Sequence, residues 1–176
     1  NGFTGGLGAK MQGDFALNRS DVFHILVGQQ GIDGNNDGSG GGGGSFVTKG
    51  SNLANVQPLL VAGGGSGGST SGGNGNDGLI TESGGVGDNG HLGGTKGSGG
   101  QDNDINNGAP AGGGFLSNGE CLDCWSGSNG TGKSFKNYGL GGDSQLSGGF
   151  GGGAAGWSSG SGGAAAGGYS GGGAQY

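Results

Sequence analysis

The sequence predicts a mainly β fold in which a small β core carries a bundle of polyglycine-II helices, with little or no α-helix. Glycine supplies 58 of the 176 residues, in tracts that lack collagen's strict three-residue repeat and its abundant proline. Leu, Ile, Val and Phe number only 29, and they cluster in short runs. Because glycine buries no side chain and loses the most backbone entropy on ordering, such tracts fold only through lateral contacts between backbones. Disorder is the alternative, but a formal net charge of −6 is modest for a disordered chain of this length.

Four short apolar runs in the first third of the chain predict β-strands. Residues 14–17 and 21–27 are separated by a polar turn, and the second run is rich in β-branched and aromatic residues. Residues 45–49 and 58–62 are the other two runs, and the last leads directly into a glycine tract. His24 falls inside the run 21–27, where we interpret it as a cross-strand packing residue and not as a catalytic base.

The remaining chain alternates between glycine tracts and sparse apolar residues. We divide one integrated domain into a β-rich core portion (1–62), a polyglycine-II array (63–114), a sparse β or apolar segment that returns to the core (115–147) and a glycine-rich tail (148–176). No segment shows a helical period with caps, and the three-residue period in the tail is weak.

Charge and hydropathy limit the partners. Twelve acidic residues against six basic ones, with a pI near 4.4, argue against binding to nucleic acid, which requires basic patches. No apolar run approaches the ~18 residues that cross a membrane. The chain begins with Asn1 and not with Met, which we interpret as the start of a processed or excised segment.

Several ordered landmarks resemble one known family. They are residues 21–31, 41–47, 58–65, 132–135, 148–153 and 168–173. In this order they resemble the glycine-rich extracellular domain found in anaplastic lymphoma kinase and leukocyte tyrosine kinase, and the resemblance covers essentially the whole chain. It implies a β-sandwich similar to tumour-necrosis-factor folds, from which a packed array of polyglycine-II helices emerges. The domain also occurs in secreted and surface proteins, and nothing in this chain indicates a kinase or a transmembrane helix.

Cys121 and Cys124 form a C-x-x-C pair, for which an extracellular structural disulfide is the favoured interpretation and free thiols are the alternative. A redox motif would require a surrounding βαβ pattern, which is lacking. A zinc site would need two further ligands, and the only histidines are His24 and His91. We therefore expect no catalytic residue, cofactor or bound metal at this pair.

Calcium is the one metal for which the sequence offers weak candidates. Residues 72–80 match the calcium-binding nonapeptide G-G-x-G-x-D-x-U-x, with Asp77 as its acidic residue. Asp33 and Asp37 in an earlier loop would supply further oxygen ligands. Only one clean repeat exists, so a solvated polar turn is the alternative that we favour.

Residues 127–134 match the phosphate-loop pattern G-x-x-x-x-G-K-S, but the flanking residues predict neither the preceding strand nor the following helix that phosphate binding requires. Asn18 and Asn129 begin N-glycosylation sequons, which are meaningful in a secreted chain.

The sequence thus favours a non-enzymatic, extracellular or cell-surface structural module. Extended glycine segments leave backbone donors and acceptors unpaired at the surface of an array, and these groups favour contact with other chains. We expect the partner to be a copy of the same chain, as in a fibre or matrix, or another extracellular protein. The alternative is the ligand-binding glycine-rich portion of a receptor-tyrosine-kinase-like ectodomain. An enzyme or nucleotide-binding protein acting through Lys133 and Ser134 is the least favoured function.

Overall fold

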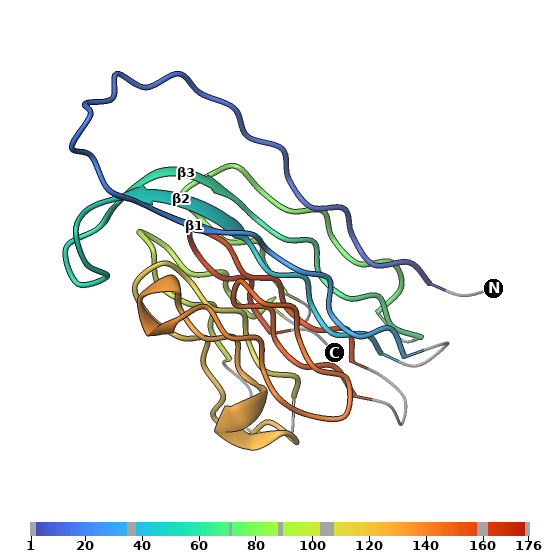
Figure 1. Cartoon of the computed structure of the whole chain (residues 1–176). Coiled ribbons are helices and arrows are strands. Elements are labelled where there is room, and N and C mark those ends of the chain that lie inside the picture. The colour runs from blue at the N-terminus through green and yellow to red at the C-terminus, as the bar shows by residue number, and fades with distance from the viewer. Residues whose placement is uncertain are drawn as a thin grey trace.

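The structure is a computed structural model that describes residues 3–34, 38–70, 72–87, 90–102, 108–157 and 162–174. Its strands form one antiparallel sheet in the order β1–β2–β3 (Figure 1). The elements are β1 (Phe23–Leu26), β2 (Ser45–Lys49) and β3 (Gln57–Ala62), and the short 3-10 helices η2 (Gly127–Gly130) and η3 (Phe135–Asn137). The prediction of a mainly β fold is confirmed, and no α-helix occurs in the described part of the chain.

Three of the four predicted strands form, and the prediction for residues 14–17 is wrong. This segment lies on an arch, residues 10–20, that pairs with no strand of the sheet (Figure 1). The arch passes close to the outer side of β3, where a Cβ on Gly13 would lie 3.5 Å from Leu60 Cδ2. Phe15 and Leu17 are 42% and 57% exposed. A short apolar run becomes a strand only when a neighbouring strand pairs with its backbone, and residues 14–17 pair with none of the strands of the sheet.

One face of the sheet packs against a small aromatic core. Opposite residues in an antiparallel pair share a face, so the register Leu26↔Phe46↔Val61 places these three side chains together, and all three are buried. The ring centroid of Phe135 lies 5.0 Å from that of Phe46 and 5.3 Å from that of Phe115. The core therefore joins the sheet to two aromatic residues that follow it by more than fifty positions.

Most of the remaining chain forms what we call the glycine array, a set of extended segments that run side by side away from the sheet (Figure 1). The segments are residues 3–9, 28–34, 38–44, 63–69, 73–79, 84–87, 91–101, 108–114, 147–156 and 162–174. Hydrogen bonds between backbones that are distant in sequence link these segments to one another. The array thus pairs many of the backbone groups of glycine without a conventional sheet.

The hydrogen bonds of the array repeat every three residues, as the segment 38–44 shows. Its successive N–H groups point in turn to three different neighbours. Ser39 and Gly42 donate to Gly68 and Gly65, Gly40 and Gly43 donate to Ile32 and Gln29, and Gly41 and Gly44 donate to Ala154 and Gly151, with N···O distances of 2.8–3.1 Å. Every third residue therefore faces the same neighbouring segment.

Close approach between backbones excludes side chains from most of the array. A Cβ atom placed on Gly43 would overlap the carbonyl oxygen of Phe150, and one on Gly100 would overlap that of Gly172. Where the chain has alanine instead, the methyl groups are completely buried, as at Ala154, Ala164 and Ala165. Glycine is required at these positions for clearance between backbones and not for an unusual φ angle.

A salt bridge fixes the point where the arch enters the sheet. Asp21 Oδ2 lies 2.7 Å from Lys49 Nζ and accepts a hydrogen bond from the backbone N–H of Asn18, also at 2.7 Å. The hydrogen bond from Asn18 and then the interaction with Lys49 hold the pKa of Asp21 below its ordinary value of 3.8. Both partners favour the ionised carboxylate, so the folded state binds the proton less readily than the unfolded state does.

We expect Asp21→Asn to flatten the acid end of the stability profile. A lowered folded-state pKa gives stability that is fully present above the unfolded pKa, near 3.8, and is lost as the pH falls toward the folded value. Urea midpoints at pH 7, 4 and 2.5 measure this contribution. The difference between the wild type and Asp21→Asn should shrink as the pH falls, whereas Asp14→Asn, an exposed aspartate on the same arch, should leave the profile of the wild type unchanged. Equal profiles for the two variants would contradict the assignment.

Candidate assembly face and disulfide cluster

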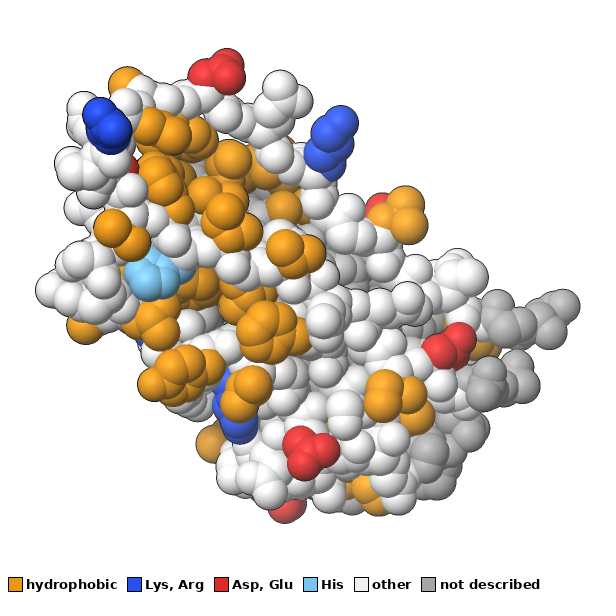
Figure 2. Space-filling model, in the orientation of Figure 1, with side chains coloured by type: hydrophobic (Ala, Val, Ile, Leu, Met, Phe, Trp, Pro, Cys, Tyr) orange, Lys and Arg blue, Asp and Glu red, His pale blue; other side chains and the backbone are white. Residues whose placement is uncertain are grey.

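The outer side of the sheet carries a row of apolar side chains that is strongly exposed along β1 and half-buried at Phe23, Val47 and Leu60. The register Ile25↔Val47↔Leu60 places three apolar side chains in a row across it, and Val27 continues the row along the chain. Ile25 and Val27 are each 69% exposed. Figure 2 shows hydrophobic side chains gathered over the sheet and the arch, with few charges among them. We call this surface the open face, defined by Phe23, Ile25, Val27, Val47 and Leu60.

The strand β1 is at the edge of the sheet, and no described strand pairs with its outer side. Gly50 N–H donates to Val22 O at 2.9 Å. By the alternation of an antiparallel ladder, the backbone N–H and C=O groups of His24 and Leu26 then point to β2, whereas those of Phe23 and Ile25 point away from the sheet. A pocket of about 240 Å³ lies next to this edge. It is lined by His24, Ile25, Leu26, Val27, Leu53, Phe135, Tyr138 and Phe150. An exposed apolar edge strand of this kind is a typical site for pairing with another chain.

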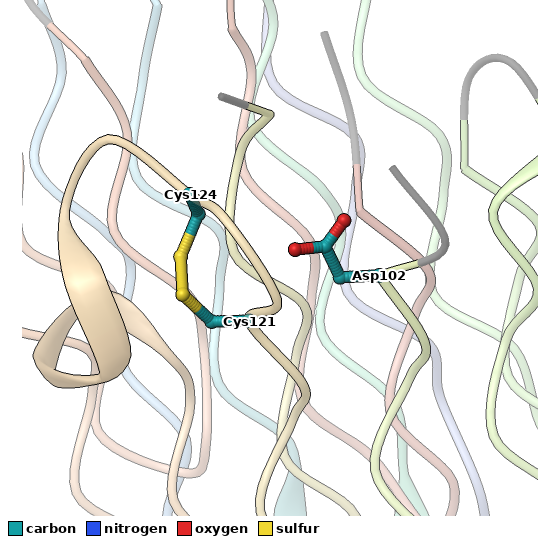
Figure 3. Close-up of side chains that lie close together, drawn as sticks. All are labelled: Asp102, Cys121 and Cys124. Carbon is teal, nitrogen blue, oxygen red and sulfur yellow. A yellow bond between two sulfur atoms is a disulfide. The ribbon is translucent and has the colours of Figure 1, made fainter. Parts of the chain in front are cut away.

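The predicted disulfide between Cys121 and Cys124 is confirmed. Figure 3 shows that the side chain of Asp102 points toward it from another segment of the array. The two sulfur atoms and a carboxylate oxygen of Asp102 all lie within 4.8 Å of one another. Asp102 is completely buried, and its Oδ2 accepts a hydrogen bond from the N–H of Leu122 at 2.8 Å. This hydrogen bond to the carboxylate therefore holds the disulfide loop against the array.

His91 extends this cluster, because its Nδ1 lies 3.8 Å from Asp102 Oδ1 and its side chain is 2% exposed. The thiolate, and not the disulfide sulfur, is the form of cysteine that binds metal. In the oxidised form the cluster therefore has a structural role. The sequence had no signal for Asp102, which lies in a polar stretch nineteen residues before Cys121. Only the lateral packing of the array brings it to the disulfide.

Two of the three calcium candidates, Asp77 and Asp33, lie in the described part of the chain, and each accepts a hydrogen bond from the protein. Asp77 Oδ1 accepts a hydrogen bond from Leu7 N–H at 2.7 Å, and Asn74 Oδ1 accepts one from Thr4 N–H at 3.0 Å. Asp77 thus holds the N-terminal segment against the array. Asp33 accepts a hydrogen bond from Ser39 Oγ at 3.4 Å, and Asp37 lies outside the described residues. In the described ranges, the one cluster of three potential metal-binding side chains is that of Asp102 and the two cysteines.

The phosphate-loop-like motif adopts a different structure from a phosphate loop. It is preceded by the disulfide loop and followed by η3, a single 3-10 turn of three residues. Lys133 Nζ bends back to donate hydrogen bonds to Ser128 O at 2.8 Å and Thr131 Oγ1 at 2.9 Å, and burial lowers the pKa of Lys133. Ser134 Oγ accepts a hydrogen bond from Asn137 N–H and caps η3. Both side chains therefore stabilise this loop.

The asparagines of the two sequons are exposed, although Thr131 of the second sequon is buried. Asn18 is exposed on the arch, and Asn129 is exposed in η2. His24 lies opposite Thr48 in the sheet, and its Nε2 is 3.1 Å from Gly50 O. This position is that of a cross-strand packing residue, as the sequence predicted.

Comparison with protein-family models gives no match to this chain, and comparison with curated proteins gives none either. In the part of the chain that the structure describes, no helix has the length and hydropathy needed to span a membrane.

Proposed function

We propose that this chain is a non-enzymatic extracellular structural module that assembles with copies of itself. The observation that carries the proposal is the open face. An antiparallel sheet that has one solvated side normally alternates apolar and polar residues. Here both sides of β1 are apolar except for His24, and the outer side of β2 adds Val47 between Ser45 and Lys49. Contiguous exposed apolar surface of this kind marks an interaction site.

The β-sandwich implied by the family resemblance fits this proposal. A sandwich needs a second sheet over the first, about 10 Å away, to cover the apolar side chains between them. The described residues supply one sheet only. We propose that the sheet of a second copy covers the open face, so that the sandwich is completed between molecules.

We propose further that the glycine array consists of polyglycine-II helices. A polyproline-II-type helix has three residues per turn and no internal hydrogen bonds, so its backbone groups bond only to neighbouring helices. The three-residue repeat of the hydrogen bonds from Ser39 to Gly44 supports this geometry. Such an array is a rigid body on which the open face is mounted. The Cys121–Cys124 disulfide supports an oxidising, extracellular location.

Sedimentation velocity tests the assembly. We expect the wild type to sediment as a species larger than the 16.4 kDa chain, and Ile25→Asp to sediment as a monomer with the thermal stability of the wild type. Val86→Asp is the matched control, because Val86 is 56% exposed but lies in the array and not on the sheet. A wild type that stays monomeric at every concentration, or an Ile25→Asp variant that assembles like the wild type, would contradict the proposal.

A second candidate function is the recognition of an extended peptide by a receptor-like module. The pocket of about 240 Å³ beside the free edge of β1 favours it, because strand addition combines a backbone edge with a pocket for alternate side chains. A monomeric wild type that captures an apolar extended peptide would favour this candidate over self-assembly.

A further inference from the structure

A groove of about 600 Å³ runs along the array beside the N-terminal segment, residues 3–9. Its other walls come from residues 28–33, 39–45 and 62–67. Figure 1 shows the N-terminal segment, coloured dark blue, along one margin of the array. Glycine supplies about half of the described lining residues, and most of the others are small or uncharged. Among the described residues, Asp33 is the one charged side chain that lines the groove.

The hydrogen bonds of the floor reveal a missing neighbour. Within the segment 63–69, two of the three directions of the three-residue repeat are occupied. Gly63, Ser66 and Ser69 donate to Leu79, Asn76 and Gly73, while Gly64 and Gly67 donate to Gly167 and Ala164. Gly65 belongs to the third direction and lines the groove. It is buried, and its N–H donates to no described residue.

The N-terminal segment repeats the same pattern. Gly6 and Ala9 donate to Ser66 and Gly63, and Thr4 and Leu7 donate to Asn74 and Asp77. Gly5 and Gly8 are the residues of the third position in the three-residue repeat. Both line the groove, and their N–H groups donate to no described residue. Two walls therefore present backbone donors toward one space: Gly65 from one wall, and Gly5 and Gly8, three residues apart, from the other. Gly5 and Gly8 are exposed, but Gly65 is buried, and a buried backbone N–H without a partner is costly. The space therefore favours an occupant that accepts a hydrogen bond from Gly65 and further ones from Gly5 and Gly8.

We propose that the groove is a vacant position in the glycine array, which takes one extended glycine-rich segment from a second copy of this chain. A segment of seven residues in the polyproline-II form is about 20 Å long, which matches the seven-residue wall that borders the groove. Elsewhere in the array, neighbours approach so closely that a Cβ would overlap a carbonyl group, so an occupant with larger side chains fits poorly. The near absence of charged residues from the lining disfavours a strongly charged partner.

A second copy is the occupant because the groove is continuous with the open face. Ser45 and Ala62 line the groove and also belong to β2 and β3, on the same side of the sheet as Val27. A copy that docks on the open face reaches the groove with its own array. This inference rests on the proposed self-assembly for the source of the segment, but the groove's preference for glycine is tested independently.

The test uses the Ile25→Asp variant, so that self-assembly does not compete, and a capped synthetic peptide with the sequence of residues 38–44 as the probe. Amide NMR signals of Gly5, Gly8 and Gly65 should shift and become protected from exchange as peptide is added. A peptide with valine at its central position should bind at least about tenfold more weakly, because its side chain prevents close backbone contact.

A matched pair of substitutions locates the binding. Gly8 lines the groove, and a Cβ there meets nothing closer than 3.8 Å, so Gly8→Leu should fold and should weaken peptide binding at least about tenfold. Gly85, where the nearest atom is 3.9 Å away, lies outside the groove, and Gly85→Leu should bind like its parent.

The possible outcomes separate this inference from the proposed function. No amide shift at millimolar peptide, or equal binding of the glycine and valine peptides, overturns the inference, even if the wild type assembles. Specific glycine-peptide binding in a protein whose wild type is monomeric supports the vacant position but overturns a second copy as its occupant. Specific binding together with assembly that Gly8→Leu weakens supports the inference in full.

Discussion

Gly171→Ala is expected to destabilise the folded chain by about 3 kcal/mol, the upper end of the usual range for overpacking, since the backbone that the new methyl group meets cannot move aside. Gly171 lies inside the array, where its N–H donates to Ser98 O at 3.0 Å. A methyl group there would overlap the carbonyl group of Gly112 and lie 2.8 Å from the backbone nitrogen of Gly100. For a domain of this size the melting temperature should fall by about 6–12 °C.

The adjacent glycine is the matched control for this prediction. At Gly172 the nearest atom to an added Cβ is 3.4 Å away, an ordinary van der Waals contact, and its φ needs no glycine. Gly172→Ala should therefore change the stability by less than about 1 kcal/mol. Differential scanning calorimetry on the two variants measures the contrast. If both variants melted like the wild type, the tract would be a loose tail and not a packed segment.

Phe46→Ala should have a comparable or larger effect through the β core. Phe46 is 1% exposed in the middle strand of the sheet, and its ring packs against those of Phe135 and Phe115 at centroid distances of 5.0 and 6.4 Å. Removing a buried phenylalanine ring leaves a cavity and costs about 3–5 kcal/mol. We expect a lower urea midpoint with an unchanged slope, because the array and the core share residues and unfold together.

Phe3 supplies the control for Phe46. It is 47% exposed at the end of the N-terminal segment, so Phe3→Ala should cost less than about 1 kcal/mol. Two separate unfolding transitions in Phe46→Ala, with the second at the midpoint of the wild type, would show that the array is stable without the aromatic core. That result would contradict the single cooperative unit described above.

The strands of the sheet were predictable because short β-branched and aromatic runs leave few alternatives. The runs 21–27, 45–49 and 58–62 each overlap a strand of the sheet. Residues 14–17 have the same local character, and the prediction failed because strand formation depends on a partner that only the tertiary path of the chain provides. The course of the arch is not encoded in that run.

The three-residue hydrogen-bond repeat of the array could not be predicted from the sequence, for a different physical reason. Its three-residue repeat is carried by backbone hydrogen bonds, and the sequence of a glycine tract carries no side-chain pattern that reports them. The disulfide was predictable from its spacing, but Asp102 and His91 reach it only through lateral packing of distant segments. The open face was missed because Ile25 and Val27 are of the types that usually lie inside a buried strand.

Electron microscopy of the wild-type protein at neutral pH tests the central claim most directly. We predict ordered filaments or sheets with a constant repeat, in which the open face of each copy meets another copy, and we predict that Ile25→Asp removes them. Dispersed particles of the 16.4 kDa chain at concentrations well above those used for sedimentation would contradict a self-assembling module.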